Sequence, residues 1–335
     1  MKVALLIARL SGFAIASMVA GCGGVQSPLF PAGEQAGRVF SLLQVMLWVC
    51  GGVYLLVMAF LGWSLWRARR PAATAPAGDE KLDRGLRRWI ALVLAGLTIL
   101  IVTSFLTDRF LARPLAGEAI DIRVTAQQWW WRIAYRDPAS GAWIETADEL
   151  HLPVGRTARV TLASSDVIHS FWVPNVAGKM DVIPGRRNVI HLTPRRLGWF
   201  RGQCAEFCGT QHALMALDVK VETADDFRAW LSLQARDATP PTDATLVRGM
   251  KVVTEGACAQ CHVVRGTAAD GRPGPDLTHV GSRRTLAAGA LPMSRGALQG
   301  WIVQPQALKP GTLMPAVGLE PVDADAAARF LESLR

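Results

Sequence analysis

Soft metal donors crowd one short stretch of the chain, residues 204–215. It reads Cys-Ala-Glu-Phe-Cys-Gly-Thr-Gln-His-Ala-Leu-Met, so two thiols, an imidazole and a thioether fall within twelve residues, at Cys204, Cys208, His212 and Met215. Sulfur and imidazole ligands together favour copper or zinc. The thioether favours copper, because zinc sites are built from Cys, His and carboxylate ligands. Two thiolates four residues apart can each bridge two metal ions, so the stretch predicts a dinuclear copper site.

Two coppers need a second imidazole, and His169 is the best candidate. It lies upstream in the stretch 165–174, which reads Ser-Asp-Val-Ile-His-Ser-Phe-Trp-Val-Pro. The alternative is a structural zinc knuckle, which uses only Cys and His ligands and would leave Met215 and the distant His169 unexplained. We therefore expect His169 to converge with residues 204–215 in the fold.

A second cysteine pair, Cys258 and Cys261, is followed directly by His262. The sequence Cys-Ala-Gln-Cys-His is a c-type haem attachment motif. Its thiols form thioethers with the haem vinyl groups, and its histidine is placed to ligate iron. The sixth iron ligand should be Met or His, and Met314 and Met293 are the candidates. Disulfides within the two cysteine pairs are the alternative use of these thiols.

The elements that must position these donors change in character along the chain. From about 118 to 222, short apolar runs alternate with polar residues and are separated by Pro and Gly, which predicts an all-β sandwich or barrel. A helical pattern first appears at 225–235. Residues 238–245 read as a Pro-containing linker, and helices are expected at 246–255, 295–303 and 323–333.

Two charge-free stretches, of 28 residues at 39–66 and 19 residues at 89–107, are long enough to cross a bilayer as helices. The loop between them is basic and is predicted to be cytoplasmic. Everything after residue 108 would then lie outside the cytoplasm. The seven basic residues of the loop, set against Asp79, Glu80 and Asp83, are Arg67, Arg69, Arg70, Lys81, Arg84, Arg87 and Arg88.

The N-terminal residues 1–21 are typical of a signal peptide, with a basic start and an apolar run that ends in small residues. Val-Ala-Gly-Cys at 19–22 resembles a bacterial lipoprotein cleavage box, which would make Cys22 the lipidated first residue of the mature chain. Cys50, inside the first predicted span, is expected to be a buried spare thiol. The net charge of +9 does not indicate nucleic-acid binding, because part of it flanks the spans and no nucleic-acid motif is present.

The pattern Cys-x-Glu-x-Cys-x-x-x-His-x-x-Met, with Asp-Val-Ile-His-Ser-Phe upstream, resembles the dinuclear copper (CuA) site of cytochrome oxidase subunit II. The resemblance implies that Cys204 and Cys208 bridge both coppers. It also implies that His169 and Met215 complete one copper, and that His212 and the backbone carbonyl of Glu206 complete the other. The Glu206 side chain would bind a magnesium ion shared with subunit I.

Two further stretches carry the resemblance. Gln-Trp-Trp-Trp at 128–131 is similar to the aromatic stretch of the same family and implies that electrons enter at Trp129, whereas packing explains Trp130 and Trp131 equally well. Lys-Pro-Gly-Thr-Leu-Met-Pro at 309–315 resembles the loop of the distal methionine in small cytochromes, which favours Met314 over Met293. Gly-Pro-Asp-Leu at 274–277 resembles the proximal loop, whose Pro275 carbonyl would accept from the His262 ring.

The remaining histidines have ordinary interpretations. His151 and His191 lie in apparent strands without partner ligands and are expected to be ordinary polar positions. His279 follows the Gly-Pro-Asp-Leu stretch and is expected to support a loop and not to bind a metal.

The resemblance covers nearly the whole mature chain and implies a multi-domain membrane protein. It would have two transmembrane helices, then an all-β cupredoxin-like domain, then an all-α class I cytochrome c domain. The expected boundaries are 1–21 for the signal peptide, 22–107 for the N-terminal segment and hairpin, 108–237 for the CuA domain, 238–245 for the linker and 246–335 for the cytochrome domain.

Fused subunits of this kind resemble those of caa-type (caa3) oxidases in the bacterial inner membrane. By that likeness the chain accepts electrons from a donor cytochrome c through its own haem c and CuA, and passes them to haem a and the haem-copper centre of subunit I. Oxygen reduction there is coupled to proton translocation, and subunit III and membrane lipid would be further partners. The alternatives are a CuA subunit of a nitric oxide reductase and a stand-alone membrane-anchored electron carrier.

Overall fold

The computed structural model describes residues 24–69, 79–112 and 118–335. The predicted signal peptide 1–21 and the predicted lipidation site Cys22 lie outside the described residues. Residues 37–116 form one compact unit, and residues 1–36 with 117–335 form the other. Each unit is considered by itself below.

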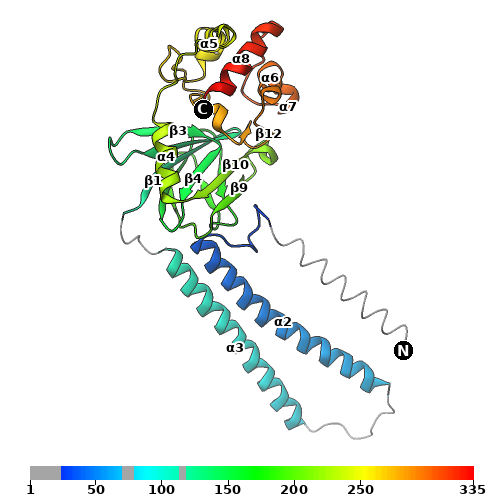
Figure 1. The fold of residues 1–335 in the computed structure, drawn as a ribbon. Coiled ribbons are helices and arrows are strands. Elements are labelled where there is room, and N and C mark those ends of the chain that lie inside the picture. The colour runs from blue at the N-terminus through cyan, green and yellow to red at the C-terminus, as the bar shows by residue number, and fades with distance from the viewer. Residues whose placement is uncertain (1–23, 70–78, 113–117) are drawn as a thin grey trace, which may run out of the picture. The chain divides into compact units, whose positions relative to one another are not determined.

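The hairpin unit contains two long helices, α2 (Glu34–Ala68) and α3 (Asp79–Leu111) (Figure 1). Both are long and apolar enough to cross a membrane, with mean hydropathies of 2.2 and 2.4 over their most apolar stretches. Each extends past the predicted charge-free span. Gly96 of α3 faces the Val49 side chain of α2, and Arg38 lies over the ring of Phe110, 4.3 Å from its centroid.

Cys50 is exposed on α2, so the expectation of a buried thiol is wrong. The helix is apolar around its whole circumference and has a single helical partner among the described residues. Most of its side chains, including Trp48, Leu55 and Trp63, are therefore exposed, as suits a helix that faces lipid.

A β-sandwich of two five-stranded sheets follows, which confirms the predicted all-β architecture. The strand orders are β3-β2-β1-β5-β8 and β4-β10-β9-β6-β7. The strands are β1 (Ile120–Gln127), β2 (Trp130–Arg136), β3 (Trp143–Ala147), β4 (Glu149–Pro153), β5 (Ala158–Ser164), β6 (His169–Trp172), β7 (Met180–Val182), β8 (Asn188–Leu192), β9 (Gly198–Cys204) and β10 (Ala216–Glu222).

The sandwich core comes from the inward-facing residues of both sheets. In β1 the side chains of Ile122, Val124 and Ala126 are buried, whereas Arg123 between them is exposed. The largest buried side chains are Trp131, Tyr135 and Phe171, and Trp131 meets Phe171 edge-on with ring centroids 5.6 Å apart. This packing fixes the strand ends from which the copper-type donors project.

Residues 24–36 also belong to this unit, since they pack on the sandwich. The buried Asn175 side chain donates to the carbonyls of Gly24 and Phe30 and accepts from the backbone N–H of Ser27. The Gln35 amide exchanges hydrogen bonds with Thr193. A short segment just after Cys22 is thus fastened to the sandwich.

The helical part begins after α4 (Ala224–Gln234), which Thr223 caps through the Asp226 N–H. Its elements are α5 (Ala244–Glu255), η2 (Ala257–Gln260), η3 (Val280–Ser282), β11 (Thr285–Leu286), β12 (Leu291–Pro292), α6 (Arg295–Val303), α7 (Pro305–Leu308) and α8 (Pro321–Ser333). α5 begins two residues before the predicted start because Asp243 caps it, and α8 begins two residues early at Pro321.

The helices α5 and α8 cross at very close range (Figure 1). A Cβ at Gly249 would lie 2.0 Å from the carbonyl oxygen of Ala326, so only glycine allows this approach. Phe330 and Val253 are buried in the same small core. Leu331 of α8 lines the cavity described below.

His151 is not the ordinary polar position that its sequence context predicts. It is 3% exposed and lies between two carboxylates, with Nδ1 2.7 Å from Glu222 and Nε2 2.9 Å from Glu149. Trp230 stacks on the ring, with centroids 3.9 Å apart. Burial lowers the pKa of His151, but its hydrogen bonds to Glu149 and Glu222 outweigh burial and raise that pKa above 6.5. Because Glu222 comes from a strand 71 residues away, the sequence did not reveal the cluster.

Replacing His151 by glutamine should therefore destabilise the protein in a pH-dependent way. The raised pKa means that the imidazolium contributes fully below pH 6.5 and that this contribution is lost as the pH rises through the folded value. The depressed pKa of Glu222 means that its contribution is lost as the pH falls well below 4.5. We expect a loss of about 3 kcal/mol near pH 5.5 and a smaller loss at pH 9, measured by denaturant unfolding of the unit that contains the sandwich.

His191 is the matched control, because it lies half-buried in β8 of the same sandwich and no carboxylate faces it. Its replacement by glutamine should change stability little at either pH. Equal losses at pH 5.5 and pH 9 for the His151 variant would contradict a charged imidazole.

Candidate functional site

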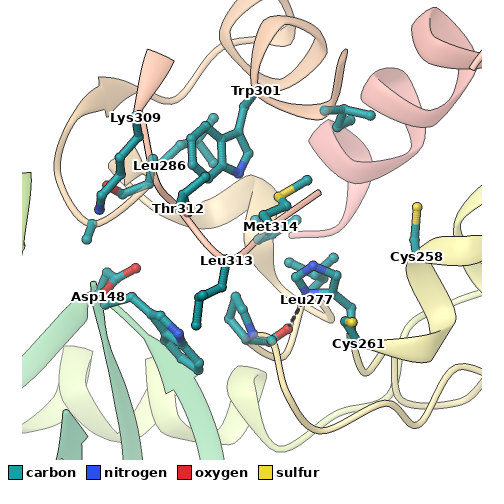
Figure 2. A pocket seen from close by; sticks show the side chains of 18 of the residues that line it. Asp148, Cys258, Cys261, Leu277, Leu286, Trp301, Lys309, Thr312, Leu313 and Met314 are labelled. Carbon is teal, nitrogen blue, oxygen red and sulfur yellow. Dashed lines mark hydrogen bonds between the residues drawn. The ribbon is translucent and has the colours of Figure 1, made fainter. Parts of the chain in front are cut away.

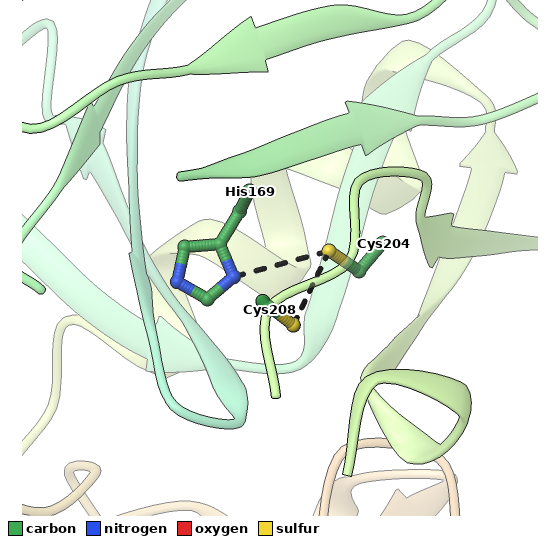
Figure 3. Close-up of side chains that lie close together, drawn as sticks. All are labelled: His169, Cys204 and Cys208. Atoms are coloured by element: carbon green, nitrogen blue, oxygen red, sulfur yellow. Dashed lines mark hydrogen bonds between the residues drawn. The ribbon is translucent and has the colours of Figure 1, made fainter. Parts of the chain in front are cut away.

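Strand pairing brings the copper-type donors together. Cys204 ends β9, and β9 pairs with β6 in a register that sets Phe171 opposite Cys204. That pairing places His169, the first residue of β6, beside Cys204 although 35 residues separate them (Figure 3). The loop after β9 carries Cys208, and the short η1 helix (His212–Leu214) leads to Met215.

The two sulfur atoms form the centre of this group. Cys204 Sγ lies 3.8 Å from Cys208 Sγ, 3.8 Å from His169 Nδ1 and 3.2 Å from the Glu206 carbonyl oxygen. Cys208 Sγ lies 3.6 Å from His212 Nδ1 and 3.8 Å from Met215 Sδ. The structure thus gathers His169, Cys204, Cys208, His212, Met215 and the carbonyl of Glu206, all of the residues that the sequence proposed for this site.

Cys204 and Cys208 are not joined by a disulfide in this structure, because a bonded pair would lie about 2.05 Å apart. The two thiols are hydrogen-bonded to each other, and this contact lowers the pKa of Cys204 and raises the pKa of Cys208. A metal cation that displaced their protons would meet two thiolates.

Asp166 orients the imidazole of His169. Its Oδ1 lies 2.8 Å from His169 Nε2, and its Oδ2 accepts from the backbone N–H of Gln128 at 2.6 Å. A proton held on Nε2 by the carboxylate leaves Nδ1 free to act as a ligand, as is usual for metal-binding histidines. The sequence pattern included Asp166 but gave no sign of this role.

The donor set fits a pair of coppers better than a zinc ion. Two thiolates, two imidazole nitrogens, a thioether and a carbonyl exceed the four ligands of structural zinc, and thioethers suit copper. His169, Cys204, Cys208 and Met215 are all buried, so these donors are shielded from water. The side chain of Glu206 is exposed and therefore accessible to another ligand.

Trp129 lies directly against the copper-type site. Its indole N–H donates to the Cys208 carbonyl at 2.9 Å, and the Gln128 amide donates to the same oxygen at 2.8 Å. Trp131 is fully buried in the sandwich core, so packing explains it. Trp130 is partly buried and lines the cavity described next.

The haem attachment motif opens onto a cavity of about 240 Å³ (Figure 2). Cys258, Cys261 and His262 line it together with Met314, and Figure 2 shows the cysteines and Met314 around the same space. Met293 is absent from the described lining and packs on the small helical core instead. The remaining walls are largely apolar and include Leu277, Leu286, Leu298, Trp301 and Ile302.

The ring of His262 is oriented as predicted. Its Nδ1 donates to the Pro275 carbonyl at 2.9 Å, which confirms the expected contact and leaves Nε2 as the ligand atom. Burial lowers the pKa of His262, so the ring is neutral at ordinary pH. A Cβ at Gly274 would lie 2.8 Å from this ring, so only glycine can occupy the position.

A buried guanidinium atom supports an anionic occupant of the cavity. Arg283 lines the cavity, and its Nε is a buried donor that has no hydrogen-bond partner among the described residues. Haem carries two carboxylates as well as an apolar ring, and the walls match both features. His279 lies outside the cavity, where its Nε2 is 3.0 Å from the Arg236 carbonyl and supports the segment after α4, as expected.

The two sites share a wall. Trp129, Trp130 and Asp148 of the sandwich line the same cavity as the haem motif. Trp129 itself is 8% exposed, and the 309–312 loop lies beside it, because a Cβ placed on Gly311 would be 3.9 Å from the indole. Lys309 in this loop also bonds to the sandwich, a contact that the pattern at 309–315 did not indicate.

Two family models match the chain in adjoining segments. Residues 120–222 match the periplasmic domain of cytochrome c oxidase subunit II, and residues 246–335 match cytochrome c. A cytochrome c oxidase subunit 2 from Alkalihalophilus pseudofirmus is 31% identical over 94% of this chain and 93% of the relative. One from Bacillus sp. strain PS3 is 30% identical over 96% of this chain and 95% of the relative. The crystal structure of the periplasmic domain of a subunit II from Bradyrhizobium japonicum is 32% identical and covers 35% of this chain and 95% of that domain, with a TM-score of 0.33.

Proposed function

We propose that this chain is the electron-accepting subunit of a caa3-type terminal oxidase. It belongs to the cytochrome c oxidase subunit II family and carries a cytochrome c domain. It would take electrons from a donor cytochrome c and pass them to haem a and the haem-copper centre of subunit I, in a complex that translocates protons. The oxygen chemistry would belong to that partner, with subunit III as a further neighbour.

One observation carries this proposal: a complete set of copper-type donors and a complete haem attachment site lie on either side of one wall. Cys204, Cys208, His169, His212, Met215 and the Glu206 carbonyl would hold a copper pair, and Cys258, Cys261, His262 and Met314 would hold haem c. When bound, the copper pair and the haem would supply reversible one-electron chemistry, which requires no bond to be made or broken.

The protein's own residues would keep both sites rigid and dry. Asp166 holds the His169 ring, and Pro275 holds the His262 ring, so neither ligand needs to reorient when the charge at the site changes. The sandwich core buries the thiolates. An electron-transfer site requires that its ligands rearrange little when an electron arrives or leaves.

The burial of Trp129 bears on the role that its sequence context implies. Only 8% of the side chain is exposed, which leaves little of the indole for a separate donor protein to contact. We propose that electrons from outside are accepted at the haem, and that Trp129 lies on the internal route to the copper site. Its N–H bond to the Cys208 carbonyl links the indole directly to a copper-bridging residue.

The remaining roles follow from the same family. We propose that α2 and α3 anchor the chain in a bacterial inner membrane, with the copper and haem domains on the extracytoplasmic side. The exposed Glu206 side chain would contribute to a magnesium site at the contact with subunit I. Cys22 would carry lipid, which incorporation of labelled fatty acid at that residue would test.

Purification of the tagged full chain from its native membrane tests the function. We expect a many-span haem-copper subunit to copurify, with two coppers in this chain beside one covalent haem. Oxygen consumption with a reduced cytochrome donor should accompany the complex. A chain that purifies alone, or a complex that reduces nitric oxide and not oxygen, would contradict the proposal.

A further inference from the structure

Lys309 is a buried cation at the junction of the two sites. Its side chain is 2% exposed, although lysine is almost never buried without a partner. The ammonium group donates to the carbonyl oxygens of Trp129, Leu214 and Ala287 at 2.8, 2.9 and 3.0 Å. Three carbonyls satisfy its three N–H donors.

The three acceptors belong to three different parts of the relay. The Trp129 carbonyl belongs to the residue whose indole lies between the two sites. The Leu214 carbonyl belongs to the copper-type loop, between His212 and Met215. Ala287 lies in the cytochrome segment that lines the cavity. One side chain therefore ties together the tryptophan, the copper-type loop and the cytochrome domain.

Lys309 also begins the loop that carries Met314, the proposed iron ligand. Gln306 braces this loop from within, because its amide donates to the carbonyls of Thr312 and Met314 and accepts from the Gly311 N–H. A second tie comes from the other side, where the Gln211 amide donates to the Pro310 carbonyl at 2.5 Å. The loop is thus braced from within, and Lys309 supplies two of its described hydrogen bonds to the sandwich where Gln211 supplies one.

The charge of Lys309 is partly balanced by Asp148. Burial raises the pKa of Asp148 to about 6, and the charges of Lys309 and Arg283 lower it. Burial lowers the pKa of Lys309 to about 8, so the ammonium form is present at neutral pH. A neutral replacement would leave three carbonyls without their donor and Asp148 with less compensation.

We propose that Lys309 is a positioning residue that fastens the Met314 loop to Trp129 and to the copper-type loop, and that this attachment sets the rate of electron transfer between the two sites. The inference rests on the proposed function. Other contacts hold the domains together independently, such as Thr285 to Asp218 and the Ala216 N–H to Ala288. Loss of Lys309 should therefore release the loop locally and leave the domains docked.

The test uses the full chain, loaded with copper and haem, at pH 6.5. Lys309→Met keeps the length of the side chain and removes the ammonium. Electrons are injected into the haem by a photochemical reductant, and their arrival at the copper site is followed by absorption. We expect the transfer to slow by about tenfold, the effect of losing even one bond to a charged donor, while haem reduction and both absorption spectra are unchanged.

Hydrogen exchange supplies a readout that does not depend on electron transfer. Amides at 127–131 and 306–314 should exchange faster in Lys309→Met, while the Ala216 amide, which donates to Ala288 across the two domains, should keep its protection. Lys251→Met, an exposed lysine on α5, is the matched control and should change neither measurement. An unchanged transfer rate together with unchanged exchange would overturn the positioning role.

If Lys309→Met does not accumulate, Gln211→Met decides the question, because it removes the single tie to Pro310 and keeps Lys309. We expect a smaller slowing of electron transfer and faster exchange in the same loop, and a wild-type rate would reject the proposal.

The positioning role of Lys309 and the proposed electron relay fail in different ways. If the relay itself is wrong, the unmodified chain will show no transfer from haem to copper at all.

Discussion

Replacing Cys208 by serine should abolish the copper pair. A serine hydroxyl is a hard donor that stays protonated near neutral pH, so it cannot replace a bridging thiolate. Cys208 is also the sulfur closest to His212 Nδ1 and Met215 Sδ, at 3.6 and 3.8 Å. Its loss would therefore detach these donors from the group. Copper content should fall from two ions per chain to one or none.

The visible and near-infrared absorption of a mixed-valence copper pair should disappear with the metal. The covalent haem, held 50 residues further along the chain by Cys258 and Cys261, should keep its normal absorption. Cys50→Ser is the matched control, since that thiol is exposed on α2 and belongs to the hairpin unit. A Cys208→Ser chain that retained two coppers and the wild-type bands would refute the assignment of the site.

The sequence predicted the ligands because their chemistry is local. Cys204 to Met215 and Cys258 to His262 are short patterns whose residue types select metals directly. His169 was found only because a second imidazole was required. The β6–β9 pairing that delivers it could not be worked out from alternation alone, which fixes the face of a strand and not its neighbour.

What the sequence could not predict are the partners that come from distant segments. Lys309 bonds to carbonyls 180, 95 and 22 residues away, and a backbone carbonyl carries no signature in the sequence. The pKa of His151 is raised in part by its hydrogen bond to Glu222, which the parallel pairing of β4 with β10 brings near. The same limit explains Trp129, whose exposure depends on where another domain docks.

The haem site allows the sharper test of the ligands, because two methionines compete for one role. Met314 lines the cavity with His262, whereas Met293 packs on the helical core. Met314→Leu keeps the volume and apolar character of the side chain and removes only the sulfur. We therefore expect the methionine-to-iron band in the red to vanish while the haem stays covalently attached.

The haem potential should fall in the same variant, because methionine ligation raises it relative to most other axial ligands. A drop on the order of 0.1 V is expected from the range that axial ligands span, measured by redox titration at the haem absorption. Met293→Leu is the control and should leave both the band and the potential unchanged. The reverse pattern would assign the sixth position to Met293 and would separate the Met314 loop from the iron. Lys309 would then hold a loop without a ligand, and its replacement should slow electron transfer only through Trp129.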